Sequence, residues 1–119
     1  MQGNEIHQAA IATAELLAAS ACSYPFGPEH QVFKVADKIF LLLTERHGEK
    51  IVTLKCREQD GELHRAIYDS IRPGYHMNKR HWITVWPGEK ISAALISQLV
   101  EESYRLVLEG VPKYRRPKF

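Results

Sequence analysis

The feature that most constrains the fold of this chain is a run of three β-strand patterns joined by very short turns. Apolar and polar residues alternate in VFKV (32–35), as expected of a half-buried strand. The dipeptide Ala36-Asp37 is long enough for a hairpin turn into KIFLLLTE (38–45), and RHGE then turns into KIVTLKC (50–56). Because a parallel pair needs a crossover of a dozen or more residues, strands joined this way pair antiparallel. The sequence therefore predicts an antiparallel meander between residues 32 and 56.

Helical patterns lie on both sides of this meander. Residues 5–20 carry apolar side chains at three- and four-residue intervals, and Asn4 stands where an N-cap is expected. A second, shorter helix is expected within 57–70, with Leu63 and Ile67 on its apolar side. The sequence thus predicts one helix before the meander and one directly after it.

A strand and a long helix complete the chain. HWITVW (81–86) alternates, with Ile83 and Val85 on one face and both tryptophans on the other. From 92 to 109 a broad apolar stripe predicts the clearest helix, and Gly110 follows it where a C-terminal cap is wanted. Helices against an antiparallel sheet indicate a two-layer α+β domain with the helices on one face. We assign residues 1–111 to this single domain and 112–119 to a flexible basic tail.

Charge is distributed unevenly along the chain. The last eight residues hold four basic side chains and no acid, whereas the preceding 111 hold 12 basic and 14 acidic side chains. A second window without acids runs from Ser70 to Gly88. The longest apolar run, Ile39 to Leu43, is far too short for a membrane span, and the N-terminal segment lacks a basic leader. With two cysteines that form no disulfide framework, we expect a cytoplasmic protein without membrane association.

The stretch PGYHMNKRHWITV (73–85) concentrates the side chains that contact nucleic acid. Lysine and arginine hold phosphates, amides donate hydrogen bonds, and aromatic rings stack on bases. Lysines on the first hairpin and arginines in the tail would add salt-dependent affinity. The candidate nucleic-acid-binding residues are Lys79, Arg80, Asn78, His76, His81, Tyr75, Arg72, Lys34, Lys38, Arg115 and Arg116.

Several blocks of the sequence resemble the MmcQ/YjbR-like family. They are YPFGPEHQVFKVADKIF, TLKC, PGYHMNKRHWITV and LVEESYRLV, which span about Tyr24 to Val107 in the family's order. The resemblance implies a CyaY-like, secretion-chaperone-like fold of order α-β-β-β-α-β-β-α, with one more short strand near Tyr75. It also implies a DNA-binding role through a double wing of β-hairpins. The chain departs from the family at Ala36-Asp37, where two glycines are usual, and an acid at a wing tip repels phosphate.

Other interpretations of the same residues stay open. HMNKRHW fits a buried structural network: Lys79 would pair with Glu101 or Glu102, Asn78 would cap loop backbone, and Trp82 would pack in the core. Lysines at 34 and 38 would equally protect edge strands from aggregation.

The remaining function classes have weaker patterns. Cys56 with a distant histidine is the only nucleophile pair, and the histidine spacing fits no usual metal site. We expect no enzyme activity, no cofactor and a monomer. The alternative function is a module that binds a peptide, a protein or a small ligand, with Trp86 and an exposed Trp82 in an aromatic patch.

Overall fold

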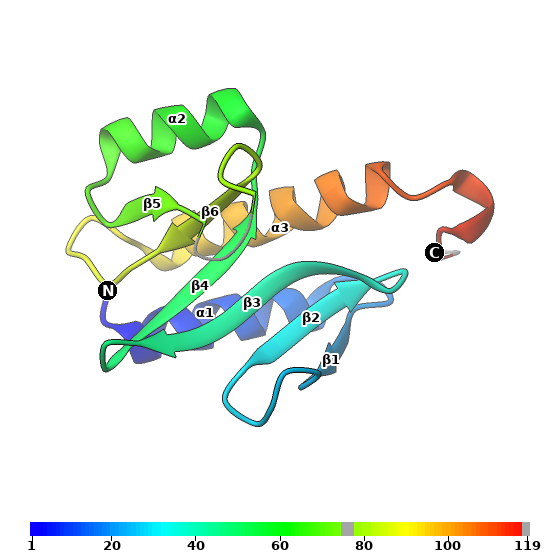
Figure 1. The fold of residues 1–119 in the computed structure, drawn as a ribbon, viewed down its shortest axis with the longest axis horizontal. Coiled ribbons are helices and arrows are strands. Elements are labelled where there is room, and N and C mark those ends of the chain that lie inside the picture. Colours follow the sequence, from blue (N-terminus) through cyan, green and yellow to red (C-terminus); the bar gives the residue numbers. More distant parts are fainter. Residues whose placement is uncertain (75–77, 118–119) are drawn as a thin grey trace.

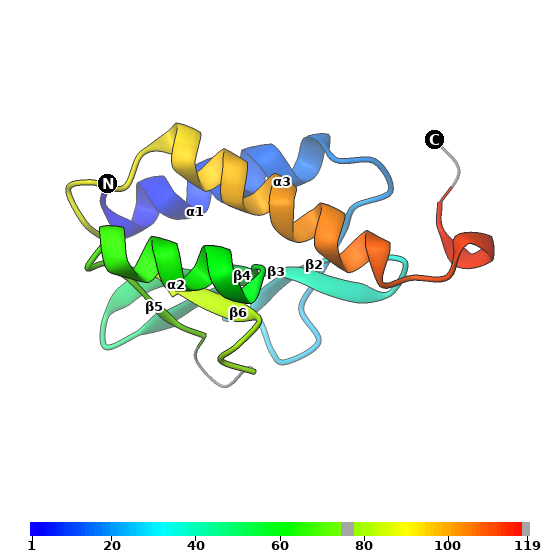
Figure 2. The same cartoon turned by 90° about the horizontal axis from the view of Figure 1, so that it is seen from above.

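The computed structural model describes residues 1–74 and 78–117 as three helices on one side of a six-stranded antiparallel sheet (Figures 1 and 2). Strand order across the sheet is β1-β2-β3-β4-β6-β5. The predicted two-layer α+β class is therefore confirmed. The elements are α1 Gly3–Leu16, β1 Ala21–Ser23, β2 Gln31–Val35, β3 Lys38–Arg46, β4 Glu49–Lys55, α2 Glu58–Ile67, β5 Ile71–Pro73, β6 Trp82–Val85, α3 Ala93–Glu109 and a 3-10 turn, η1, Lys113–Arg115.

The meander predicted from residues 32–56 forms as strands β2, β3 and β4. Ala36 and Asp37, with φ of 49° and 64°, make the two-residue turn between β2 and β3. Two left-handed residues in succession are what a hairpin loop of this length requires. The extra strand expected near Tyr75 is present as β5, Ile71–Pro73; Tyr75 itself lies outside the described residues.

The first helix differs from its prediction at both ends. It begins at Gly3 with Gln2 as N-cap, not at Glu5 after Asn4. It ends at Leu16 rather than residue 20, and Leu16 is 87% exposed. Alanine-rich sequence favours helix, but helical segments persist where an apolar face packs; Leu17 still packs against the core, whereas Ala18 and Ala19 are exposed. The chain instead reverses at Ala19, φ 58°, and adds the edge strand β1, which the sequence analysis missed.

The second helix packs differently from its prediction. Leu63 and Ile67 of α2, expected to pack, are 56% and 50% exposed. In α2 only Gly61 is buried, and a Cβ there would stand 3.4 Å from Cγ2 of Ile83. The third helix ends as predicted, with Gly110 as its C-cap, in a right-handed conformation (φ −77°).

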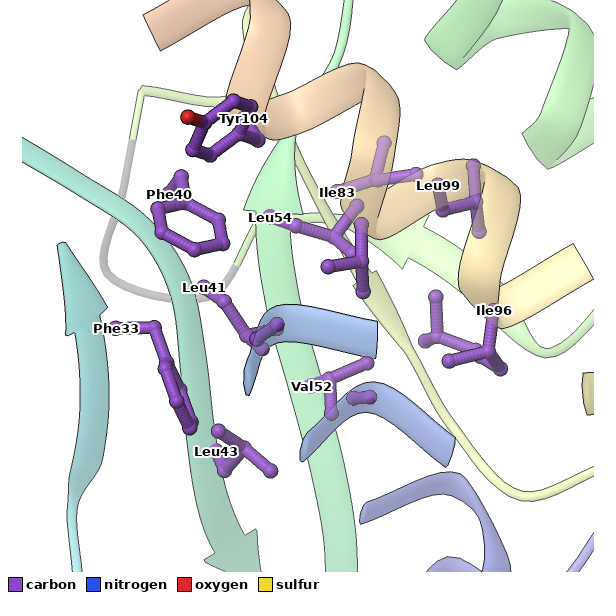
Figure 3. Packing of buried hydrophobic residues seen from close by; sticks show 14 of the residues in the cluster. Phe33, Phe40, Leu41, Leu43, Val52, Leu54, Ile83, Ile96, Leu99 and Tyr104 are labelled. Carbon is purple, nitrogen blue, oxygen red and sulfur yellow. The ribbon is translucent and has the colours of Figure 1, made fainter. Parts of the chain in front are cut away.

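The core lies between the sheet and the pair α1 and α3 (Figure 3). Figure 3 shows Phe33, Phe40 and Tyr104 together at one end, where the Phe40 and Tyr104 rings meet edge to face at 5.3 Å. Tyr104 is 7% exposed and belongs to the core, and its hydroxyl donates to the Ala18 carbonyl at 2.7 Å. Ile83 and Val85 join this core as predicted.

A β-bulge lies beside this aromatic cluster. Phe33 pairs with Leu41, but the next residue, Lys34, pairs with Ile39, so Phe40 is the extra residue of β3. The bulge lets Phe40 and Leu41 both be fully buried although they are neighbours on a strand. It also interrupts the regular ladder where Phe40 stands opposite the end of β4. The hydroxyl of Ser103 on α3 accepts from Lys55 N at 2.8 Å and donates to Phe40 O at 2.6 Å, bridging this interruption.

Candidate nucleic-acid interface

Two hairpins of the sheet carry basic residues at the same end. The first hairpin is β2–β3 with its turn at Ala36-Asp37, and the second is formed by β5 and β6. Strand pairing fixes their position: β2 ends and β3 begins where Val35 meets Lys38, and β4 ends and β6 begins where Lys55 meets Trp82. The end of β4 therefore lies between the two hairpins.

A hollow of about 430 Å³ lies at this end. Its basic and aromatic lining comes from Lys34, Lys38, Lys55 and Trp82, with Asp37 as its one acid. Its remaining walls are Ile39, Val107 and Gly110. We call it the lysine hollow.

The three ammonium groups of the lysine hollow have no ion-pair partner among the described carboxylates. Asp37 lines the hollow but is not within ion-pair distance of them. Positive charges gathered in one concave site create a local positive potential that attracts anions. The arrangement is suited to a polyanion or a phosphate-bearing ligand.

The backbone around Trp82 is fixed by its neighbours. Gly74 N donates to Trp82 O at 2.8 Å, and Cys56 N donates to the His81 carbonyl at 2.8 Å. At Gly74 a Cβ would stand 2.6 Å from Cβ of Trp82, so only glycine permits this approach. Trp82 is half-buried and is not part of the core, contrary to the structural interpretation of this tryptophan.

Residues 78–81 form an exposed turn that leads directly into Trp82. The Asn78 side-chain oxygen accepts from Arg80 N at 3.0 Å, and its carbonyl accepts from His81 N at 3.2 Å. The capping role considered for Asn78 is thus confirmed. Lys79, Arg80 and His81 are exposed, whereas Tyr75 and His76 lie outside the described residues.

The partner considered for Lys79 on the last helix is not observed. Glu102 pairs instead with Arg105, 2.8 Å away, and in the described ranges no ion pair connects Lys79 with Glu101 or Glu102. Its ammonium group therefore remains available to a ligand.

The remaining predicted arginines are engaged elsewhere or lie to one side. Arg72 stacks over the Trp86 ring at 5.0 Å, a cation–π contact at the other end of β6. Trp86 stays partly exposed beneath Arg72, and of the two tryptophans only Trp82 lines the lysine hollow. Arg116 donates from Nε to Val111 O at 2.8 Å and from Nη2 to Glu109 O at 3.1 Å. It closes the carboxyl end of α3, while Arg115 is exposed.

The start of the tail, which was expected to be flexible, forms a short turn bonded to the end of α3. Residues 113–115 form the η1 turn, and Arg116 holds that turn to the helix end. Figure 1 places η1 and the β2–β3 turn at the same end of the molecule. The tail thus brings charge near the lysine hollow.

Two members of the lysine hollow were missed as site residues. Lys55 was not among the candidate residues, and Trp82 was considered either for the core or for an exposed aromatic patch. Lys55 follows Leu54 and Trp82 precedes Ile83, both fully buried. Alternation from these core positions puts Lys55 and Trp82 on the opposite face of the sheet, but it does not show that the two residues pair with each other at adjoining strand ends.

A second concave region separates α2 from α3. It has a volume of about 370 Å³ and contains cationic, acidic and thiol side chains. His64 Nδ1 is buried without a described hydrogen-bond partner. The lining residues are Lys55, Cys56, Arg57, Asp60, Leu63, His64, Gln98, Leu99, Glu102 and Arg105. We call it the interhelix pocket.

The interhelix pocket brings together the one nucleophile pair that the sequence offered, Cys56 with a histidine. Burial, and then the neighbouring Asp60 and Glu102 carboxylates, raise the pKa of the Cys56 thiol to about 11. The thiolate is the nucleophilic form, so at neutral pH this cysteine is protonated. In residues 1–74 and 78–117, no three His, Cys, Asp or Glu side chains are grouped closely enough to hold a metal ion.

The fold and the lysine hollow define a class: small two-layer α+β domains with two hairpins at one end of an antiparallel sheet. The YjbR family model matches residues 17–106. The chain is 45% identical to the uncharacterized protein YbdF of Escherichia coli O157:H7, over 95% of this chain and 93% of that protein. It is 32% identical to the uncharacterized protein YjbR of Escherichia coli K12, over 70% of each. The chain therefore belongs to the YjbR family, as its sequence blocks indicated.

Solved structures support the same assignment. The crystal structure of Deinococcus radiodurans protein DR2400, a DUF419 domain, superimposes with a TM-score of 0.80 at 32% identity, covering 97% of this chain and 86% of that one. A solution structure from Pseudomonas syringae matches with a TM-score of 0.68 at 29% identity, covering 85% and 91%. The described helices include none that is both long and apolar enough for a membrane crossing.

Proposed function

We propose that this protein is a non-catalytic DNA-binding protein that holds the phosphate backbone in the lysine hollow between its two hairpins. The observation that carries the proposal is the convergence of Lys34, Lys38 and Lys55 on one concave site with no ion-pair partner among the described residues. The exposed Lys79 and Arg80 lead into the same site through Trp82. Contacts of this kind fix a protein on the backbone without reading base sequence.

The proposal includes a monomeric protein in the cytoplasm. Cys22 and Cys56 are both free thiols, which suits a reducing compartment. The protonated Cys56 thiol supports a binding role over a catalytic one.

The test is a fluorescence-anisotropy titration of labelled DNA at two salt concentrations. The double variant Lys38→Gln/Lys55→Gln removes two charges from the lysine hollow. The matched control Lys50→Gln/Lys90→Gln removes two charges from exposed positions outside it. We expect the first variant to lose about tenfold or more in affinity. Its plot of log K against log salt should flatten by roughly 1.4–1.8, since each phosphate contact contributes about 0.7–0.9.

Comparison of the two double variants shows whether the lysine hollow itself binds DNA. Equal losses in both would mean that total charge, not the lysine hollow, drives binding. Absence of binding by the wild-type protein at low salt would refute DNA binding altogether. A third protein that ends at Val111 measures how much of the affinity the tail supplies.

A second candidate function is the binding of a peptide or a small polar ligand in the interhelix pocket. Positive and negative side chains line it together, and His64 Nδ1 is buried there without a described partner. A ligand that carries both charges would match this lining. Thermal-shift measurements with free amino acids and short peptides test it; a shift that His64→Leu abolishes supports this function, and no shift with any of them counts against it.

A further inference from the structure

The lysine hollow contains an aromatic ring as well as cations. Trp82 is the first residue of β6 and pairs with Lys55 at the end of β4. Its side chain lines the hollow beside Lys34 and Lys38. No described residue accepts a hydrogen bond from its indole Nε1. Trp82 therefore forms part of the wall of the hollow and is not part of the core cluster.

The backbone that carries this ring is held on both sides. The close approach of Gly74 to Trp82, with the hydrogen bond from Gly74 N to Trp82 O, fixes the backbone on one side. Pairing with β4 fixes it on the other. A side chain on backbone that is already held loses less conformational entropy when a ligand binds than one on a loose segment, so more of its contact area contributes to affinity.

The composition of the hollow distinguishes between forms of nucleic acid. Lysines contact phosphates of single strands and duplexes alike. A flat aromatic ring in a hollow is useful only to a base whose face is free, and in a duplex each base is stacked between its neighbours. Stacking of unpaired bases on aromatic side chains beside a basic groove is the usual mode of single-strand binding. The volume of about 430 Å³ is also that of a small-ligand site, suited to one nucleotide unit rather than a double helix.

We infer that the lysine hollow takes an unpaired nucleotide of a single strand, with its base on Trp82 and its phosphates on Lys34, Lys38 and Lys55. This inference rests on the proposed function, which requires only backbone contact, and adds the strandedness of the nucleic acid. Ile39 and Val107 supply an apolar wall beside the base.

The experiment compares a labelled single-stranded oligonucleotide, its duplex, and the same single strand with abasic sites. It uses the wild-type protein, Trp82→Leu and Trp82→Phe, each checked for folding by thermal denaturation. We expect tighter binding of the single strand than of the duplex. Trp82→Leu should weaken single-strand binding by about 5- to 150-fold, the range for loss of one stacked base. Duplex binding should stay unchanged, and Trp82→Phe should retain most of the affinity.

The abasic strand and the fluorescence of Trp82 provide independent readouts. The abasic strand keeps its phosphates, so it should bind wild-type protein about as weakly as the intact strand binds Trp82→Leu. In a Trp86→Phe background Trp82 is the only tryptophan, and a stacked base should quench its emission saturably.

The outcomes separate the two proposals. Equal or tighter binding of the duplex, unchanged binding by Trp82→Leu, or equal binding of the abasic strand would overturn the single-strand inference while leaving DNA binding intact. No binding of any of the three nucleic acids would overturn both.

Discussion

Asp37 opposes binding and stability in two separate ways. Its φ of 64°, like the 49° of Ala36, lies in the left-handed region, which costs a non-glycine residue roughly 1–2 kcal/mol. Its carboxylate also lines the lysine hollow, where it repels a phosphate. Ala36 shares the backbone strain but carries no charge, so the two positions allow these effects to be measured separately.

Glycine at either turn position should stabilise the protein, and only one of them should change binding. We expect Ala36→Gly and Asp37→Gly each to raise the free energy of unfolding by about 0.5–1 kcal/mol, because relief of strain exceeds the added entropy of the unfolded chain. Urea denaturation measures this. Only Asp37→Gly should tighten oligonucleotide binding, by about two- to fivefold at low salt, the effect of about 0.4–1 kcal/mol for one partly screened charge. An equal gain in Ala36→Gly would assign the effect to turn geometry instead.

The two cysteines should differ sharply in reactivity. Cys22 is exposed, whereas Cys56 is 4% exposed and its pKa is raised to about 11. Alkylation requires the thiolate, so iodoacetamide at pH 7.5 should modify Cys22 and leave Cys56 unmodified in the native protein. Mass spectrometry of the wild-type protein and of Cys22→Ser follows both sites. Comparable labelling of Cys56 would reopen a nucleophilic role in the interhelix pocket.

At the scale of elements, Ser103 connects α3 to two strands at the bulge. Its hydroxyl occupies the place of a missing ladder bond between Phe40 O and Lys55 N. Ser103 is fully buried, so no solvent is available to replace it. The same contact holds the backbone of Lys55, and through it one wall of the lysine hollow.

Removal of this hydroxyl should therefore affect stability and binding together. We expect Ser103→Ala to lower the free energy of unfolding by about 1–3 kcal/mol, the range for leaving buried polar groups unsatisfied. Single-strand affinity should fall with it, because Lys55 loses its support. Ser97→Ala is the control: Ser97 is on the same helix, its hydroxyl bonds Thr13 of α1, 2.8 Å away, and it does not line the hollow. Loss of stability without loss of affinity in Ser103→Ala would show that the position of Lys55 does not depend on this bond.

Elements whose pattern and packing agree were predictable from the sequence, and those decided by packing alone were not. The meander, β6 and α3 have strong periodicity and bury the expected side chains. The predictions for the end of α1 and for the packing of α2 were wrong. Ala-rich sequence and the spacing of Leu63 and Ile67 indicate a helix, but they do not show which residues the helix contacts. Strand β1 has three residues, mostly exposed, and carries too little pattern to detect.

The candidate site was predictable in part for a related reason. Lys34, Lys38 and the 78–81 turn were recognised from charge, but their grouping depends on which strand ends adjoin in the sheet. That order places the end of β4 between the two hairpins, and a local pattern does not contain it. Arg72 and Arg116 were equally basic in sequence, yet a ring and a helix end engage them.

At the scale of the whole molecule, the stability of the two-layer arrangement depends on how α1 sits on the sheet. His7 of α1 donates from Nε2 to the Ile51 carbonyl of β4 at 2.8 Å. Burial lowers the pKa of His7 below its ordinary value of 6.5, and the nearby Lys50 adds to this effect; the Ile51 and Thr44 carbonyls and Glu45 act in the opposite direction. The folded protein thus favours the neutral imidazole.

The protein should consequently lose stability as the pH falls. Below the unfolded pKa of about 6.5, the unfolded chain binds a proton at His7 that the folded protein does not yet bind. The contribution of His7 is therefore complete above that pH and is lost as the pH falls toward its lower folded pKa. Urea denaturation at pH 7.5 and pH 5.5 measures the change. His7→Gln keeps a donor toward Ile51 and should reduce the loss, whereas His30→Gln, which removes one histidine from the loop before β2, should retain it. A wild-type stability that stays level across this range, or an unaltered loss in His7→Gln, would mean that the contact of α1 with β4 tolerates a charged imidazole.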